Sequence, residues 1–271
     1  MPAKRPKTKP VRSKKKPARR GATSKPATSL PQPSIPTKLG PPSKLRGKNP
    51  ERVRQILEKL DEAYPNVTCA LEHRNPFELL IATILSAQCT DVRVNIVTKT
   101  LFEKYRSPSE FAHANPAELE NEIRSTGFFR NKTKSIIGAA QKLLKDFDGQ
   151  VPRTMEELLT VPGAARKTAN VVLGTAYKIA SGVVVDTHVQ RLSQRLDLTE
   201  HEDPKKIEQD LIEIIPQDKW ILFSHQLIWH GRRVCVARNP RCVECGLEKL
   251  CYSADKTLGW KLPARTATAK R

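Results

Sequence analysis

Four cysteines crowded near the C-terminal end constrain this chain more than any other feature. They follow the spacing Cys235-x6-Cys242-x2-Cys245-x5-Cys251, and the sequence has six cysteines in all. Four thiolates in one short loop can surround a metal, and the chain shows no secretory signal that would favour disulfides. Structural zinc usually takes two closely spaced cysteine pairs, whereas this loop has one C-x2-C and two wider gaps. The spacing therefore favours a 4Fe-4S cluster, with zinc as the alternative.

The first fifty residues differ in composition from the rest of the chain. They contain fifteen of the 48 basic residues, none of the 28 acidic ones and eleven of the 21 prolines, in a chain of net charge +20. Such a segment can neither form a long helix nor bury apolar surface, so we expect residues 1–47 to be a disordered basic tail. A cationic arm of this kind binds DNA without sequence preference, although a mitochondrial transit peptide is an alternative. We expect a second, short basic tail at residues 259–271.

The remaining chain is long enough for one large or two small domains, and its patterns are helical. Asn75-Pro76, Asn115-Pro116 and Asp203-Pro204 each pair a capping side chain with proline at the first helical position. Only Val183–Val185 looks like a strand, and no partner strand is apparent. No apolar run approaches the ~18 residues of a membrane span. We therefore expect a soluble, all-α protein.

Residues 154–177 have the pattern of two helices joined by a tight turn. Thr154 begins the first helix, Pro162-Gly163 forms the turn, and a helix rich in small and apolar residues follows at once. Backbone N–H groups of such a turn point outward and can bind a phosphate of a nucleic acid. A plain connection between two helices would look similar, so this segment alone leaves both interpretations open.

Two charged residues stand at helix starts, where their chemistry is altered. Lys167 lies near the N-terminus of the second helix, where the helix dipole and the neighbouring Arg166 both disfavour a further positive charge. This favours the neutral amine that a nucleophile requires, although a lysine that contacts phosphate is the alternative. Asp186 follows an apolar segment and either caps the next helix or places a carboxylate beside a reacting sugar. His188 has no spaced metal-ligand partners, so we expect it to be structural or to face DNA.

Taken in order, these motifs and the segment Leu85-Ser86-Ala87-Gln88-Cys89-Thr90-Asp91 resemble the endonuclease III family of DNA glycosylases. The resemblance runs from about Pro50 to Leu258. It implies that Lys167 is a Schiff-base nucleophile and that Asp186 is the catalytic carboxylate. It also implies that the four cysteines of the loop ligate a 4Fe-4S cluster.

The family architecture implies two helical domains that flank a DNA-binding groove. A six-helix domain is expected at residues 69–182, with the helix-hairpin-helix motif at about 154–177. An iron-sulfur cluster domain is expected from residues 48–68 and 183–258. The damaged nucleotide would be flipped out of a duplex that lies across the groove.

The resemblance also assigns contacts to DNA. Gln88 is expected to fill the hole left by the flipped nucleotide, and Phe128 to wedge into the duplex, with a core phenylalanine as the alternative. Ala165 stands where the family hairpin usually has its second glycine, which predicts a slightly altered turn. The remaining expected DNA contacts are Arg130, Lys132, Gly163, Ala165, Arg166, His188, Arg191, Arg238 and Arg241.

The implied activity is base excision at oxidised pyrimidines. Lys167 would displace the base, and the resulting imine would allow β-elimination that cuts the strand 3′ to the abasic site. Adenine- and thymine-mismatch glycosylases share the fold but normally lack this lysine, and a non-enzymatic iron-sulfur DNA sensor would not require Lys167 and Asp186 together. The expected partner is double-stranded DNA with damaged pyrimidines or abasic sites, bound by a monomer without membrane contact. The expected location is the bacterial cytoplasm, at the nucleoid, or the nucleus or mitochondria of a eukaryote.

Overall fold

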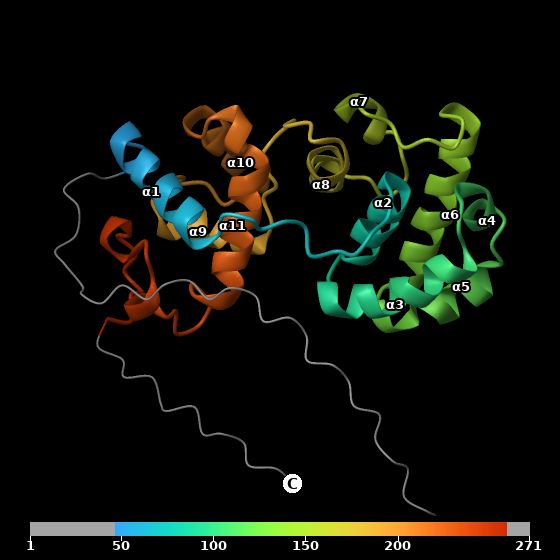
Figure 1. Ribbon diagram of the computed structural model, residues 1–271. Coiled ribbons are helices and arrows are strands. Elements are labelled where there is room, and N and C mark those ends of the chain that lie inside the picture. The colour runs from blue at the N-terminus through green and yellow to red at the C-terminus, as the bar shows by residue number, and fades with distance from the viewer. Residues whose placement is uncertain (1–46, 259–271) are drawn as a thin grey trace, which may run out of the picture. The chain divides into compact units, whose positions relative to one another are not determined.

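The computed structural model describes residues 47–258, and this part of the chain is built from helices (Figure 1). The α-helices are α1 (Pro50–Ala63), α2 (Pro76–Leu85), α3 (Asp91–Lys104), α4 (Pro108–Ala112), α5 (Pro116–Ile123), α6 (Phe129–Asp146), α7 (Met155–Leu158), α8 (Arg166–Tyr177), α9 (Thr187–Arg195), α10 (Pro204–Ile214) and α11 (Trp220–Arg233). Short 3-10 turns are η1 (Arg124–Thr126), η2 (Gln217–Lys219), η3 (Cys242–Glu244) and η4 (Glu248–Leu250). No strand occurs in the described range, which confirms the predicted all-α fold. Val183–Val185 is buried chain without a partner strand.

The helix starts form where the local sequence predicted them. The side chain of Asn75 accepts a hydrogen bond from the backbone N–H of Glu78 at 2.9 Å, and Asp203 accepts one from Lys205 at 3.0 Å. Proline occupies the first turn of both helices, where its missing N–H has no intrahelical partner to lose. These helix boundaries are therefore encoded locally, before any tertiary contact is made.

Two apolar cores hold the helices. The first is built by residues between Leu71 and Leu173, and Figure 1 shows α3, α4, α5 and α6 gathered around it. The second combines residues of α1 with residues from Val183 to Leu250. Because the described residues all belong to one compact unit, the division into two domains remains a prediction.

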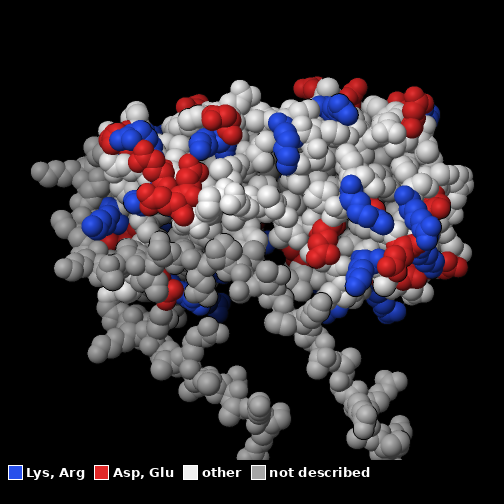
Figure 2. Space-filling view, in the orientation of Figure 1, with Lys and Arg blue, Asp and Glu red and all other residues white. Residues whose placement is uncertain are grey.

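Charge is nearly balanced over the part of the chain that the structure describes. Residues 47–258 carry 30 basic and 28 acidic side chains, and Figure 2 shows the two kinds interspersed on the face in view. The large positive charge of the sequence therefore belongs mostly to residues 1–46 and 259–271. The two predicted tails lie outside the described residues, apart from Gly47. No described helix is long and apolar enough to cross a membrane.

Candidate active site and cysteine loop

The predicted hairpin is formed by α7, a turn at Gly163 and α8. Gly163 has φ +81°, and a Cβ atom there would lie 2.9 Å from the Cβ of Ser135 and 3.2 Å from the side chain of Ile84. Glycine is therefore required both by the backbone conformation and by the close packing of the turn. Ala165, in contrast, has φ −70°, which any residue adopts. The replacement of the family's second glycine therefore causes no backbone strain at Ala165.

The start of α8 has no capping side chain, and its first residue is held by an ion pair. Arg166 donates from Nε to Glu208 Oε2 at 2.7 Å and from Nη2 to Oε1 at 3.1 Å. These hydrogen bonds raise the pKa of Arg166 above its ordinary value. Glu208, on α10, is buried and also accepts from Asn170 at 2.9 Å. Arg166, predicted to contact DNA, is thus bound to a buried carboxylate and anchors α8 against α10.

Lys167 is the second residue of α8, and its side chain is exposed. Its amine has no hydrogen-bond or ion-pair partner among the described residues. The lysine therefore stands at a helix N-terminus beside a neutralised arginine, with its amine free to react.

Asp186 caps α9, as its position after the apolar segment predicted. Its Oδ1 accepts from the backbone N–H groups of His188 and Val189, both at 2.8 Å. Among the described residues no hydrogen bond is made by its second oxygen, so the carboxylate can cap the helix and still face a substrate. The segment before it is fixed by a bond from the Val184 N–H to Ser224 Oγ at 3.0 Å. The two interpretations of Asp186 are therefore compatible.

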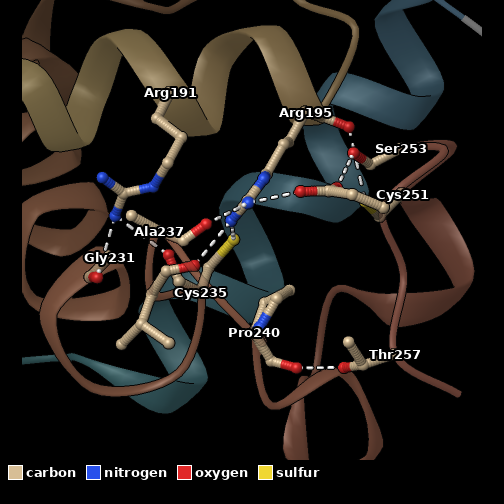
Figure 3. Close-up of polar contacts among 11 residues, drawn as sticks. Arg191, Arg195, Gly231, Cys235, Ala237, Pro240, Cys251, Ser253 and Thr257 are labelled. Atoms are coloured by element: carbon tan, nitrogen blue, oxygen red, sulfur yellow. Dashed lines mark hydrogen bonds and ion pairs between the residues drawn. The ribbon is translucent and has the colours of Figure 1, made fainter.

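All four cysteines of the loop line one cavity. Figure 3 shows that two arginines of α9 reach into this loop. Arg195 donates from Nη1 to the Sγ of Cys235 at 3.2 Å and to the Val236 carbonyl at 2.8 Å. Arg191 donates to the carbonyls of Gly231 at 3.0 Å and Cys235 at 2.9 Å. The helix capped by Asp186 is thereby tied to the cysteine loop.

Burial changes the acidity of two side chains at the loop. Burial raises the pKa of the Cys245 thiol to about 12, and its Sγ lies 3.3 Å from Nε2 of His230. Burial also lowers the pKa of His230 to about 4, and its Nδ1 lies 3.1 Å from the hydroxyl of Tyr64. Thiolates here would need positive charge close by to remain ionised, as metal ions supply.

Gln88 and Phe128 lie on two neighbouring turns and line one cleft, together with Gly163 of the hairpin. Both have left-handed backbones, with φ 53° at Gln88 and φ 47° at Phe128. The Phe128 side chain is 63% exposed, which excludes the alternative of a core phenylalanine. A large apolar side chain is thus held at the surface on a turn whose positive φ costs a non-glycine residue energy.

The other predicted DNA contacts divide into exposed and buried side chains. Arg130, Arg238 and Arg241 are exposed and remain candidates. Lys132 is only 5% exposed, and its amine donates to the carbonyls of Leu85 and Thr126, both at 2.8 Å. The prediction that Lys132 contacts DNA is at odds with this geometry, because the buried ammonium group is already bound inside the protein.

His188 and Arg191 also face the interior. Nη2 of the Arg191 guanidinium lies 3.2 Å from Nδ1 of His188, and burial lowers the pKa of that imidazole. The structural interpretation of His188 thus fits the geometry. Arg191 is held by hydrogen bonds to two carbonyls, those of Gly231 and Cys235, as Arg166 is held by Glu208.

Comparison with known proteins identifies the family. Residues 81–217 match the model of the HhH-GPD superfamily base excision DNA repair proteins. The chain belongs to this superfamily. It is 56% identical over 205 residues to endonuclease III of Synechocystis sp., which covers 76% of this chain and 94% of that relative. The resemblance to endonuclease III predicted from the motifs is thereby confirmed.

Solved endonuclease III structures have the same fold as this HhH-GPD protein. A non-covalent endonuclease III–DNA complex matches with a TM-score of 0.72 and 44% identity, covering 75% of this chain and 95% of that one. A trapped covalent endonuclease III–DNA intermediate matches with a TM-score of 0.72 and 44% identity, covering 75% of this chain and 96% of that one. The similarity thus extends to proteins captured with DNA.

The structure of this HhH-GPD protein also brings residues to the site that sequence patterns missed. Lys205 and Lys206, from the first turn of α10, line a shallow groove with Ala165 and Arg166. The only sequence signal was a pair of lysines directly after a helix start. Glu208 gave no signal, because a lone glutamate in an amphipathic helix is ordinarily solvated.

Proposed function

We propose that this chain removes oxidised pyrimidines from DNA and then cuts the strand, with Lys167 as the nucleophile for both steps. The chain is a base excision DNA glycosylase and AP lyase. The observation that carries the residue assignment is the exposed amine of Lys167, which has no described partner, at the start of α8 in the hairpin. A protein similar to this one has been trapped as a covalent intermediate with DNA, which requires a nucleophile of this kind.

The chemistry follows from one amine. The neutral Lys167 amine attacks C1′ of the flipped nucleotide, and the glycosidic bond breaks as the base leaves with its electron pair and a proton. The sugar ring opens, and the nitrogen forms an imine with C1′. The imine acidifies the C2′ proton, so its removal expels the 3′ phosphate by β-elimination. Water then hydrolyses the imine and restores the lysine.

We assign the carboxylate role to Asp186. Its Oδ1 is occupied by two backbone N–H groups, while the other oxygen is available to accept a proton from Lys167 or to face positive charge that develops on the sugar. Because those two bonds also fix the side chain, the carboxylate is held in place before substrate binds.

The four loop cysteines fit a 4Fe-4S cluster. All four thiols line one cavity. Donors spread around a cavity suit a group with several metal corners, each of which takes one thiolate. When bound, the cluster supplies the positive charge that keeps the buried thiolates ionised and orders the loop. Cys235, Cys242, Cys245 and Cys251 would hold it.

The proposed DNA surface includes the hairpin turn at Gly163, the exposed Arg130, Arg238 and Arg241, and the lysine pair of α10. Gln88 would fill the hole that the flipped nucleotide leaves in the duplex, and Phe128 would insert as a wedge beside it. We further propose that the protein acts as a monomer in the compartment that holds the DNA, which is the cytoplasm in bacteria.

The test of the function is incision of a duplex that contains one thymine glycol. We expect base release and a cut 3′ to the resulting abasic site. Specific binding without a cut would favour a DNA-binding sensor. Cutting only at a mismatched adenine or thymine would favour the mismatch glycosylases instead.

A further inference from the structure

A single buried ammonium group binds the C-terminal carbonyls of α2 and of the 3-10 turn η1. Lys132 lies in the first turns of α6 and is 5% exposed, and its Nζ donates to the carbonyls of Leu85 and Thr126, both at 2.8 Å. Leu85 is the last residue of α2, and Thr126 is the last residue of η1. Carbonyls at a helix C-terminus lack intrahelical donors and carry the negative end of the helix dipole. One cation therefore satisfies two such ends at once.

Each of these helix ends leads directly to a residue on the proposed DNA surface. Gln88 follows Leu85 by three residues, and Phe128 follows Thr126 by two. Both have positive φ, at 53° and 47°, a conformation that non-glycine residues keep only where the surroundings hold the backbone. Gln88 and Phe128 line the same cleft as Lys132.

The cost of burying the lysine argues against simple packing as its only role. Burial lowers the pKa of Lys132, which reflects the energy lost when the charge leaves water. An apolar side chain of the same length would avoid that loss but could not bond to either carbonyl. The Lys132 side chain thus links the turn after Leu85 to the turn after Thr126 at a fixed separation.

We propose that Lys132 is a positioning residue for duplex penetration, whose ammonium group sets the separation at which Gln88 and Phe128 enter the DNA. This inference rests on the proposed function, since it assumes that both side chains insert into the duplex. Lys132 itself touches neither DNA nor the reacting atoms.

The first experiment compares Lys132→Met with the wild type on two substrates that carry the same abasic site. One substrate is fully paired, and the other has the site within a small unpaired bubble, where little stacking must be broken. We measure the rate of borohydride trapping at limiting protein. Because bonds to a charged group are lost, we expect the paired substrate to react about tenfold more slowly or worse. The rate on the bubble should stay within about twofold of the wild type.

A matched variant separates positioning from stability. Ile136→Ala removes a fully buried side chain one turn further along α6 and leaves the Lys132 ammonium group and both of its hydrogen-bond acceptors present. Compared at equal folded fraction, this variant should keep the wild-type ratio of paired to bubble rates. If Lys132→Met also keeps that ratio, the proposal is overturned.

Two further variants keep the proposal testable if Lys132→Met does not fold. Lys132→Gln retains one hydrogen-bond donor group and should show a smaller loss, confined to the paired substrate. In a Gln88→Ala, Phe128→Ala background, Lys132→Gln should cause no additional loss on that substrate. A further loss of the same size there would contradict the inference. Absence of trapping by the wild type on both substrates would instead overturn the proposed function.

Discussion

Arg166 and Glu208 form a two-point ion pair, with contacts of 2.7 Å and 3.1 Å between the guanidinium nitrogens and the carboxylate oxygens. The pair joins the first residue of α8 to the buried face of α10. The charge of Arg166, next to Lys167, is thereby paired inside the protein. The same contacts fix the first turn of α8 against α10.

The ion pair should contribute measurably to stability. Glu208→Gln keeps the shape of the side chain but removes the charge, so Arg166 loses its partner inside the protein. We expect the free energy of unfolding to fall by about 1–3 kcal/mol in urea titrations. Glu213→Gln, at an exposed position of the same helix, should change it by less than about 0.5 kcal/mol. Equal losses in the two variants would mean that the pair contributes nothing specific.

The hairpin turn should tolerate change at one of its small residues but not at the other. Gly163→Ala forces a side chain into positive φ and against Ser135, so we expect a loss of about 1–3 kcal/mol in the free energy of unfolding. Ala165→Gly acts at an ordinary φ and at a capping position that accepts glycine, so its effect should stay below about 1 kcal/mol. Thermal unfolding followed by circular dichroism distinguishes them, and the reverse order of stability would refute this account of the turn.

His225 should make stability depend on pH. Burial, with smaller effects from Lys178 and Arg232, lowers the pKa of His225 from 6.5 to about 4. As pH falls, the histidine of the unfolded chain binds a proton before the buried one does, which favours the unfolded state. The stability that the neutral, buried His225 contributes is therefore fully present above about pH 6.5 and is lost as pH falls toward 4. One such group accounts for at most about 1.4 kcal/mol per pH unit.

The comparison that isolates this effect uses two histidine variants. His225→Gln should flatten the fall in unfolding free energy over that interval, measured by urea titration at several pH values. His113→Gln, at an exposed position, should leave the slope as it is in the wild type. Identical slopes in all three proteins would show that His225 does not titrate as proposed.

The cysteine loop should carry iron. Protein purified without oxygen should be brown and contain about four irons per chain. Cys242→Ser should lose both the iron and affinity for DNA, because the loop and its arginines are no longer ordered. Cys69→Ser, outside the loop, should retain both. Stoichiometric zinc in place of iron would contradict the assignment.

Local sequence signals predicted the helix boundaries because the groups involved lie within four residues of each other. Asn75 and Asp203 cap their helices with their own side chains, and Asp186 does the same at α9. The hairpin turn could also be predicted from sequence, because Gly163 stands at the position of the turn that requires positive φ.

Partners distant in sequence could not be predicted in this way. The family resemblance assigned DNA contacts to two basic residues, Lys132 and Arg191. Their hydrogen-bond acceptors are backbone carbonyls, which have no sequence signature. Glu208 pairs with Arg166 across 42 positions, and only the packing of α8 against α10 brings them together. Burial of a charge is therefore a property of the fold and not of the local pattern.

The two proposed catalytic residues should fail in different ways. Asp186→Asn removes the charge but keeps an oxygen for the helix cap. It should slow base release strongly, yet still permit some imine formation at an abasic site, where no glycosidic bond remains to be broken. Single-turnover rates on the two substrates measure this difference. Equal rates of base release by Asp186→Asn and the wild type would remove Asp186 from the mechanism.

The most direct test of the central claim is borohydride trapping with Lys167→Gln. Reduction turns the transient imine into a stable amine, so the wild type should become covalently joined to a duplex that contains an abasic site. Lys167→Gln keeps a long polar side chain but has no nucleophile, so it should bind the same duplex without forming the adduct or cutting the strand. Full trapping and cutting by Lys167→Gln would show that another amine attacks the sugar, and the assignment of Lys167 would be wrong.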